Sequence, residues 1–222
     1  MRALVISAHP DDETLGCGGT LLRHRDDGVS LSWLIATRAH EPEWSGEIIE
    51  RKTAEVECVA EALGVEQRIQ LEFPSGRLDT LPLGDLIDGI RSAVTENRPE
   101  LVYLVHGGDV HTDHQAVFAA AMSVLKPIHM AKLGVRRILC YETLSSTDAA
   151  PPLGYLNFAP NVFGDVTSYL DQKINIMSIY ETEKHQDPLP RGPSAIRALA
   201  RYRGASIGVE YAEAFVLMRE LV

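Results

Sequence analysis

Short apolar runs alternate along much of the chain with longer stretches in which apolar residues recur every three or four positions. The short runs occupy residues 3–6, 31–36, 101–105 and 137–141, and an alternating run occupies 68–73. Runs of this length that are rich in Val, Ile and Leu predict β-strands. Those that are apolar throughout predict strands buried on both faces, as in a parallel sheet.

The longer stretches predict helices between these strands, over 13–26, 47–63, 83–96 and 112–125. Gly28 and Gly64 follow the first two, where the end of a helix favours glycine. Alternation of strand and helix is typical of an open, mostly parallel α/β sheet with helices on both faces. A length of 222 residues fits a single domain, so we expect one domain over 1–222.

The last third of the chain is less regular. Residues 145–161 are rich in Pro, Gly, Ala and Ser, and we expect them to form a long loop or lid near the active site. Helices are predicted over 166–183 and 193–203, whereas 211–221 fits a strand or a helix equally well.

Composition narrows the function classes. Hydrophobic residues make up 45% of the chain and charged residues 23%, which is ordinary for a globular protein. A formal net charge of -10 disfavours nucleic-acid binding, because phosphate neutralisation needs a basic face. No apolar stretch approaches the roughly 18 residues of a membrane span.

The cysteines and the N-terminal residues give an indication of the cellular compartment in which the protein is found. Cys17, Cys58 and Cys140 form no CxxC pair, and we expect all three to be buried reduced thiols. The first apolar run is too short for a signal peptide. Both features favour a cytoplasmic location, where thiols stay reduced.

Two clusters of imidazole and carboxylate side chains each follow a predicted strand. They comprise His9, Asp11, Asp12, His111, Asp113 and His114. Right-handed crossovers place the C-terminal ends of parallel strands along one edge of the sheet, where ligands bind. We therefore expect the two clusters to meet in one site.

Three of these residues form a candidate metal site. A catalytic zinc commonly takes three protein ligands from His, Asp and Glu and keeps one position for water. His9, Asp12 and His114 supply such a set, although imidazole and carboxylate also suit Fe²⁺ or another first-row ion. The alternative is that each cluster is a polar loop that caps a helix, because helix N-termini attract carboxylates.

The other three residues are catalytic candidates. Asp11 is placed to accept a proton from a metal-bound water. His111 is placed to stabilise a developing oxyanion or to protonate a leaving amine. We expect Asp113 to hydrogen-bond His111 and to raise its pKa, which would keep the imidazole cationic near neutrality.

These motifs carry a resemblance. The run from Ala8 to Glu13 (Ala-His-Pro-Asp-Asp-Glu), followed by His-Thr-Asp-His at 111–114, resembles the PIG-L/LmbE family of zinc-dependent N-acetyl sugar deacetylases. The segments 200–204 and 211–215 are similar to the bacillithiol-synthesis branch, the GlcNAc-malate deacetylases. The resemblance spans nearly the whole chain.

The resemblance implies a Rossmann-like fold, with zinc held by His9, Asp12 and His114. It implies that Asp11 is the general base, that His111 stabilises the oxyanion and that Asp113 orients His111. It also implies an N-acetylated sugar as a small-molecule substrate, and homo-oligomers occur in the family. Some members use a tyrosine near the second motif, but residues 106–110 contain none.

The sequence thus predicts a zinc-dependent hydrolase that removes an N-acetyl group from an N-acetylglucosamine-type sugar or conjugate. An amidase acting on a larger thiol or sugar conjugate and a non-catalytic metal-binding or sugar-binding module remain as alternatives. Four residues at strand ends or near the C-terminus are candidate substrate contacts, with a surface role as the alternative. They are Arg38, Glu142, Arg201 and Arg203.

Overall fold

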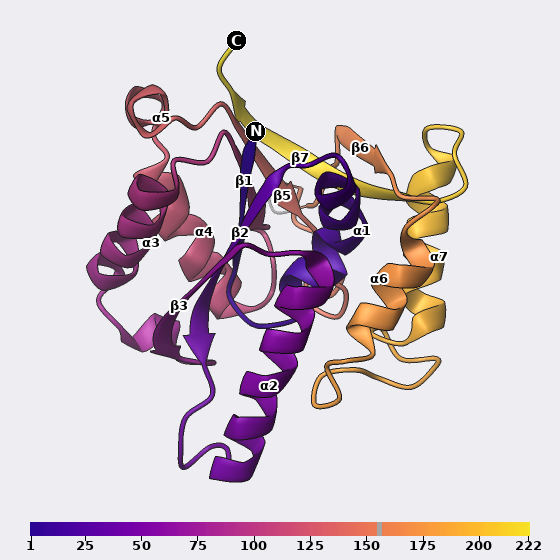
Figure 1. Ribbon diagram of the computed structural model, residues 1–222, viewed down its shortest axis with the longest axis horizontal. Coiled ribbons are helices and arrows are strands. Elements are labelled where there is room, and N and C mark those ends of the chain that lie inside the picture. Colours follow the sequence, from indigo (N-terminus) through magenta and orange to yellow (C-terminus); the bar gives the residue numbers. More distant parts are fainter. Residues whose placement is uncertain (155–156) are drawn as a thin grey trace.

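A seven-stranded sheet forms the centre of the computed structural model, which describes residues 1–154 and 157–222 (Figure 1). The strand order is β3-β2-β1-β4-β5-β7-β6. The first five strands in this order are parallel, and β7 runs antiparallel to both β5 and β6. The strands are β1 (Arg2–Ser7), β2 (Ser30–Arg38), β3 (Gln67–Pro74), β4 (Leu101–Val105), β5 (Arg137–Tyr141), β6 (Val162–Asp165) and β7 (Ala212–Glu220).

Helices cover both faces of the sheet. Figure 1 shows α3 and α4 on one side and α1, α2 and α6 on the other. The helices are α1 (Asp12–Asp26), α2 (Gly46–Leu63), η1 (Leu78–Thr80), α3 (Leu83–Asn97), α4 (Thr112–Val124), α5 (Pro127–Leu133), α6 (Leu170–Met177) and α7 (Pro193–Ala205). The predicted mostly parallel, Rossmann-like α/β sheet is therefore confirmed.

The order of the strands determines where a ligand can bind. From β1 the chain adds β2 and β3 on one side and then β4 and β5 on the other, so the connection changes direction between β1 and β4. These two strands pair directly, with Ile6 opposite Leu104. In open α/β sheets, ligands bind beyond the strand ends at such a switch point.

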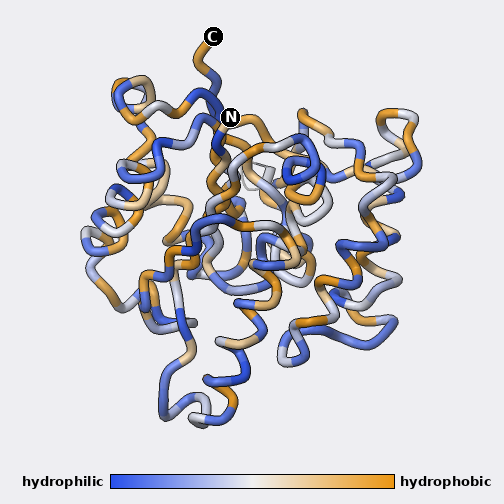
Figure 2. The backbone as a smooth tube through the Cα atoms, viewed as in Figure 1, coloured by the Kyte–Doolittle hydropathy of each residue, from blue (hydrophilic) through white to orange (hydrophobic). Residues whose placement is uncertain are grey.

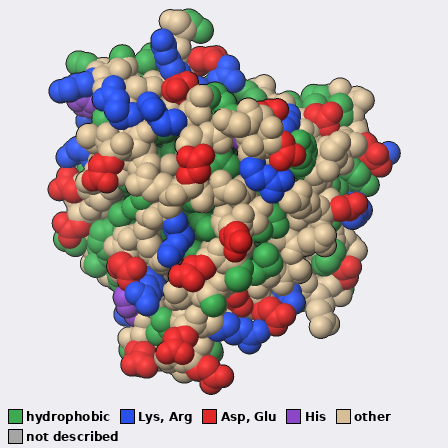
Figure 3. Space-filling view, in the orientation of Figure 1, with side chains coloured by type: hydrophobic (Ala, Val, Ile, Leu, Met, Phe, Trp, Pro, Cys, Tyr) green, Lys and Arg blue, Asp and Glu red, His purple; other side chains and the backbone are tan. Residues whose placement is uncertain are grey.

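The core consists of the strands and of the helix faces that pack on them. β4 is buried along its whole length, as is β1 after its first residue. Figure 2 shows apolar positions concentrated in the central strands, and in Figure 3 acidic and basic side chains are interspersed over much of the face shown. Cys17 and Cys140 are buried as expected, but Cys58 is exposed on α2, so that part of the prediction is wrong.

The second half of the sequence produced one error and left two elements unanticipated. The helix predicted over 166–183 is wrong, because α6 covers Leu170–Met177 alone. After Met177 the chain turns so that Glu181 forms an ion pair with Arg51 of α2, and Glu183 forms one with Lys52. The segment 211–221 forms strand β7, while β6 and α5 had no counterpart in the prediction.

The predicted lid contains no helix or strand within 145–154 and 157–161, and residues 155–156 lie outside the described part of the chain. Among the described helices, none alone has the length and apolar character of a membrane span. Of these helices, only α4 and α5 counted as one segment are long and apolar enough, and the two are bent by 76° at their junction.

Helix α1 lies unusually close to the sheet because it is rich in glycine. A Cβ atom on Gly16 would stand 2.1 Å from Cδ2 of Tyr141 in β5, and one on Gly19 would stand 2.8 Å from Cβ of Val166. Only glycine allows such an approach without displacing the neighbouring residue. This packing holds α1 against β5 and against the segment that follows β6.

A buried ion pair provides hydrogen-bond partners for backbone groups of α1 where the helix is interrupted. The helix is interrupted at Cys17, where φ is -143° and ψ is 15°. The Glu213 carboxylate of β7 accepts the amides of Gly19 and Thr20 at 2.8 and 2.7 Å. Lys173 of α6 donates to Glu213 at 2.7 Å and to the carbonyl of Leu15 at 2.8 Å. Backbone groups released by the break therefore keep partners, as burial requires.

Glu213→Ala is expected to lower the free energy of unfolding by about 3–5 kcal/mol, because it leaves the buried Lys173 ammonium without its carboxylate. Urea unfolding measures the change. The matched control is Glu210→Ala, which removes a carboxylate that is 56% exposed and is expected to stay within about 0.5 kcal/mol of wild type. Equal losses in the two variants would show that the buried pair contributes nothing specific.

Candidate active site

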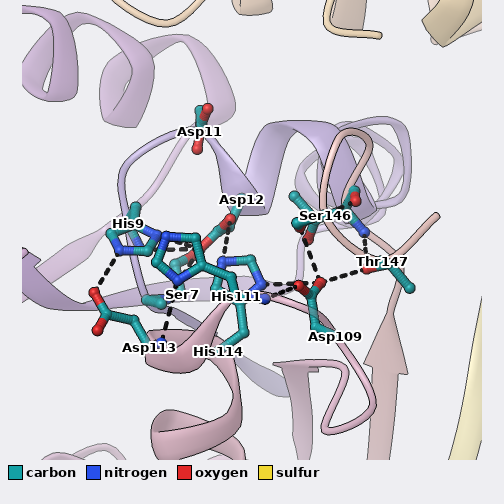
Figure 4. A network of polar contacts seen from close by, with 12 residues as sticks. Ser7, His9, Asp11, Asp12, Asp109, His111, Asp113, His114, Ser146 and Thr147 are labelled. Atoms are coloured by element: carbon teal, nitrogen blue, oxygen red, sulfur yellow. Dashed lines mark hydrogen bonds and ion pairs between the residues drawn. The ribbon is translucent and has the colours of Figure 1, made fainter. Parts of the chain in front are cut away.

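The two predicted clusters meet at the switch point between β1 and β4. His9 lies in the turn from β1 into α1, and His111 and His114 lie at the start of α4, after β4 (Figure 4). One ring nitrogen from each of these three imidazoles lies within 4.8 Å of the others. The His9 and His111 ring centroids are 4.5 Å apart, and those of His111 and His114 are 4.9 Å apart.

Asp12 places its carboxylate against two of the imidazoles. Its Oδ1 is 3.2 Å from Nε2 of His114, and its Oδ2 is 3.9 Å from Nδ1 of His9. The amides of Ala8 and His9 donate to Oδ2 at 3.0 and 2.8 Å and hold the carboxylate in this position. Burial alone would raise the pKa of Asp12, but His114 and His9 outweigh it and lower the pKa below its ordinary value.

Each of these imidazoles has a second carboxylate behind it. Asp113 Oδ2 lies 2.8 Å from Nε2 of His9, and Asp109 Oδ2 lies 3.1 Å from Nδ1 of His114. The nitrogens that remain, His9 Nδ1 and His114 Nε2, face Asp12. Metal-binding histidines usually place their second ring nitrogen on a carboxylate or carbonyl in this way.

This donor set fits a divalent cation. Two imidazole nitrogens and one carboxylate are common ligands of zinc and of neighbouring first-row ions. Burial lowers the pKa of His114, but the carboxylates of Asp12 and Asp109 outweigh it and raise the pKa to about 10, so the two carboxylates together favour a positive charge at this place. The nitrogens of His9, His111 and His114 form a second candidate set of ligands.

Asp109 is a functional candidate that the sequence analysis missed. Its Oδ2 accepts the hydroxyls of Ser146 and Thr147 at 2.9 and 2.7 Å, and its Oδ1 accepts the amide of His111 at 2.8 Å. The start of the predicted lid thus supports the carboxylate that contacts His114. The sequence feature that could have identified Asp109 is its position in the loop that follows β4.

His111 differs from its predicted state. Its Nδ1 accepts the backbone amide of Asp113 at 3.2 Å, so Nε2 is left to carry the ring proton. Burial and the nearby charges of His9 and His114 lower the pKa of His111 to about 4, against the opposite effect of Asp113. The expectation that Asp113 keeps His111 cationic is therefore wrong.

The Asp113 side chain has other partners. Besides His9, its carboxylate accepts the amides of Gly76 and Leu78 at 2.7 and 3.0 Å. These bonds connect the start of α4 to the segment that follows β3. Asp113 accordingly orients His9 through its carboxylate and His111 only through its backbone amide.

Asp11 stands beside the cluster in a constrained backbone conformation. Its φ of 103° lies in the left-handed region, and its amide donates to Glu13 Oε2 at 3.2 Å. Its Oδ2 accepts Nη1 of Arg191 at 2.7 Å. Burial raises the pKa of Asp11 well above its ordinary value, although Arg191 lowers it. In Figure 4 no dashed line joins Asp11 to the other labelled residues.

A pocket with an empty volume of about 960 Å³, its open mouth included, is lined by His9, Asp11, Asp12, His111 and His114. Arg38, a predicted substrate contact, lines the pocket and pairs with Glu72 at 2.6 Å. Residues that the sequence analysis did not single out complete the walls. They include Trp44, Lys52, Gln70, Glu183 and Arg191.

The other predicted substrate contacts lie elsewhere. Glu142 forms a two-pronged ion pair with Arg203 of α7, at 2.8 and 2.7 Å. Arg201 donates to the carbonyl of Glu210 at 3.3 Å. None of these three side chains is part of the lining of the 960 Å³ pocket in the described chain.

Comparison with known proteins agrees with the site. The family model described as GlcNAc-PI de-N-acetylase matches residues 4–125. The uncharacterized deacetylase YaiS of Escherichia coli is 33% identical over 168 residues, covering 73% of this chain and 80% of its own. The diacetylchitobiose deacetylase of Thermococcus kodakarensis is 26% identical over 225 residues, covering 96% and 81%.

A solved structure extends the likeness to the fold. A conserved protein from Thermus thermophilus superimposes with a TM-score of 0.78 at 28% identity, covering 99% of this chain and 96% of its own. The family model includes both motifs that form the cluster, since it begins within β1 and ends just after α4. The chain belongs to the PIG-L family of deacetylases.

Proposed function

We propose that this protein is a metal-dependent hydrolase that removes the acetyl group from an N-acetylglucosamine-type sugar or sugar conjugate, giving acetate and a free amine. One observation carries the proposal. Asp12 faces two imidazoles that are each held by a further carboxylate, and Asp11 lines the same pocket. A module that only bound metal or sugar would not need this additional buried carboxylate.

His9 Nδ1, Asp12 and His114 Nε2 are the proposed ligands, with Zn²⁺ as the first candidate and Fe²⁺ as the second. A divalent ion held by these residues would supply Lewis-acid chemistry: it would polarise the acetyl carbonyl and make water easier to deprotonate near neutral pH. Asp113 and Asp109 keep the two imidazoles in the tautomers that this coordination requires.

The protein's own residues carry the proton and the developing charge. We assign to Asp11 the role of general base. As the oxygen of the attacking water bonds to the acetyl carbon, Asp11 accepts a proton from that water. The Nε2–H of neutral His111 donates a hydrogen bond to the oxyanion of the tetrahedral intermediate. Asp11 then returns the proton to the amine nitrogen, and the C–N bond breaks. A neutral His111 favours Asp11 over His111 as the acid in this step.

The pocket walls support a carbohydrate substrate. Trp44, in the connection from β2 to α2, offers an aromatic ring in a lining that also includes the planar side chains of Arg38 and Gln70. Small-molecule sites commonly combine such apolar surface with a few placed polar groups. The diacetylchitobiose deacetylase among the relatives acts, by its name, on an N-acetylated sugar. The alternative, an amidase for a larger conjugate, uses the same chemistry on another acyl group.

Acetate release from N-acetylglucosamine, N-acetylglucosaminyl malate and diacetylchitobiose tests the function. We expect at least one compound to yield acetate, with activity lost after chelation and restored by Zn²⁺ or Fe²⁺. No acetate from a metal-loaded protein would refute deacetylation and favour the binding module. Cleavage of larger amides without acetate release would favour the amidase.

Asp11→Asn is expected to lower kcat by about 10²–10⁴-fold, because it removes the proton acceptor. Metal content, measured by elemental analysis, should remain that of wild type, since Asp11 is not among the proposed ligands. Asp171→Asn, at a carboxylate that is 82% exposed, serves as the control. A fully active Asp11→Asn enzyme would contradict the assignment of the base.

Metal titration tests the proposed ligands directly. His114→Ala is expected to lose bound metal, and Asp109→Asn to weaken metal affinity by about 10–100-fold because it removes the support of His114. His129→Ala, at an exposed imidazole of α5, should bind metal like wild type. Unchanged affinity in His114→Ala would exclude this histidine as a ligand.

A further inference from the structure

We propose that Arg191 is a positioning residue that holds the Asp11 carboxylate in its working place. The proposal rests on the proposed function, in which Asp11 is the base. Nη1 of Arg191 donates to Asp11 Oδ2 at 2.7 Å and to Glu183 Oε2 at 3.1 Å. One guanidinium nitrogen thus links the carboxylate of the first motif to a segment far along the chain.

Arg191 is itself held from two further directions. Its Nε donates to Oγ of Ser145 at 3.0 Å. Glu183, its other partner, also pairs with Lys52 of α2. The guanidinium is planar and its donors have fixed directions, so contacts with three segments determine its orientation. An Arg191 fixed in this way can in turn fix Asp11.

Asp11 needs a partner such as Arg191 because its backbone conformation and the burial of its carboxylate are both energetically unfavourable. Its φ of 103° is unfavourable for a residue with a side chain, and its carboxylate does not cap α1. The side chain is only 5% exposed, so water offers little compensation for the buried charge. A guanidinium at 2.7 Å offsets that cost and selects one rotamer of the carboxylate.

The position of Asp11 therefore depends on the segment that carries Glu183 and Arg191 and on Ser145, the first residue of the predicted lid. Neither segment belongs to the two motifs that supply the metal ligands. The inference is that these outer segments support catalysis through Arg191, and that Arg191 is not there mainly to bind substrate.

Steady-state kinetics on whichever compound of the acetate panel wild type hydrolyses provide the first test. Arg191→Ala is expected to lower kcat by about 10²-fold with KM little changed, because a base displaced by about an ångström loses about that much. Arg191→Lys should retain more activity than Arg191→Ala. Added guanidinium or ethylguanidinium, below unfolding concentrations, should partly restore the activity of Arg191→Ala and should not raise that of Asp11→Asn.

The matched control is Arg197→Ala, which removes a 44% exposed guanidinium that pairs with Asp171. Its kcat and KM should equal those of wild type. A raised KM at unchanged kcat in Arg191→Ala would overturn the proposal and make Arg191 a substrate-binding residue. Unchanged kinetics would overturn it as well.

A thermal double-mutant cycle decides the point even if no compound in the panel yields acetate. Arg191→Ala is expected to lower Tm in the wild-type background and to lower it clearly less in the Asp11→Asn background, because the charged partner is then absent. Equal Tm losses in both backgrounds would refute the link between the two side chains. Absence of acetate with a retained coupling would refute the proposed function alone.

Discussion

The approach of the Asp12 carboxylate to the His9 and His114 rings is the interaction on which the site depends. Asp12 and His114 are almost entirely removed from water and His9 largely so, and burying charge without a balancing partner is costly. Their convergence follows from the sheet, because β1 and β4 are neighbours at the switch point and each ends in one of the motifs. Backbone amides at Ala8 and His9 then fix the carboxylate.

Around this centre, carboxylates serve different purposes according to their surroundings. Asp113 and Asp109 are bonded by imidazoles, backbone amides and hydroxyls, which favour the ionised form and lower the pKa of each despite burial. Asp11 and Glu13 are buried as well, but there burial outweighs the polar partners and raises the pKa of both, that of Glu13 to about 7. Acid–base chemistry near neutral pH needs both kinds of carboxylate: some that stay ionised and hold other side chains in place, and some that can gain and lose a proton.

Much of the fold and the convergence of the motifs could be predicted, because apolar runs identify strands and parallel topology places their ends at one edge. Spacing alone could not say which imidazole Asp113 would contact, since His9 lies 104 positions away. Arg191 contacts Asp11 across 180 positions from a segment without periodic pattern. The helix predicted over 166–183 was too long, because after Met177 the chain turns and the buried Tyr180 donates to Glu13 of α1, a contact that local spacing does not reveal.

The interruption of α1 at Cys17 has a mechanical consequence. The turn that bears Asp12 is attached to the edge of β1, whereas the outer half of the helix, from Gly18 onward, is attached to β7 and α6 through Glu213 and Lys173. Lys173 also donates to the carbonyl of Leu15, on the inner side of the break, so the same ion pair joins both halves of the helix. A change at Glu213 or Lys173 would therefore act on the turn that carries Asp12 as well as on the outer half of α1.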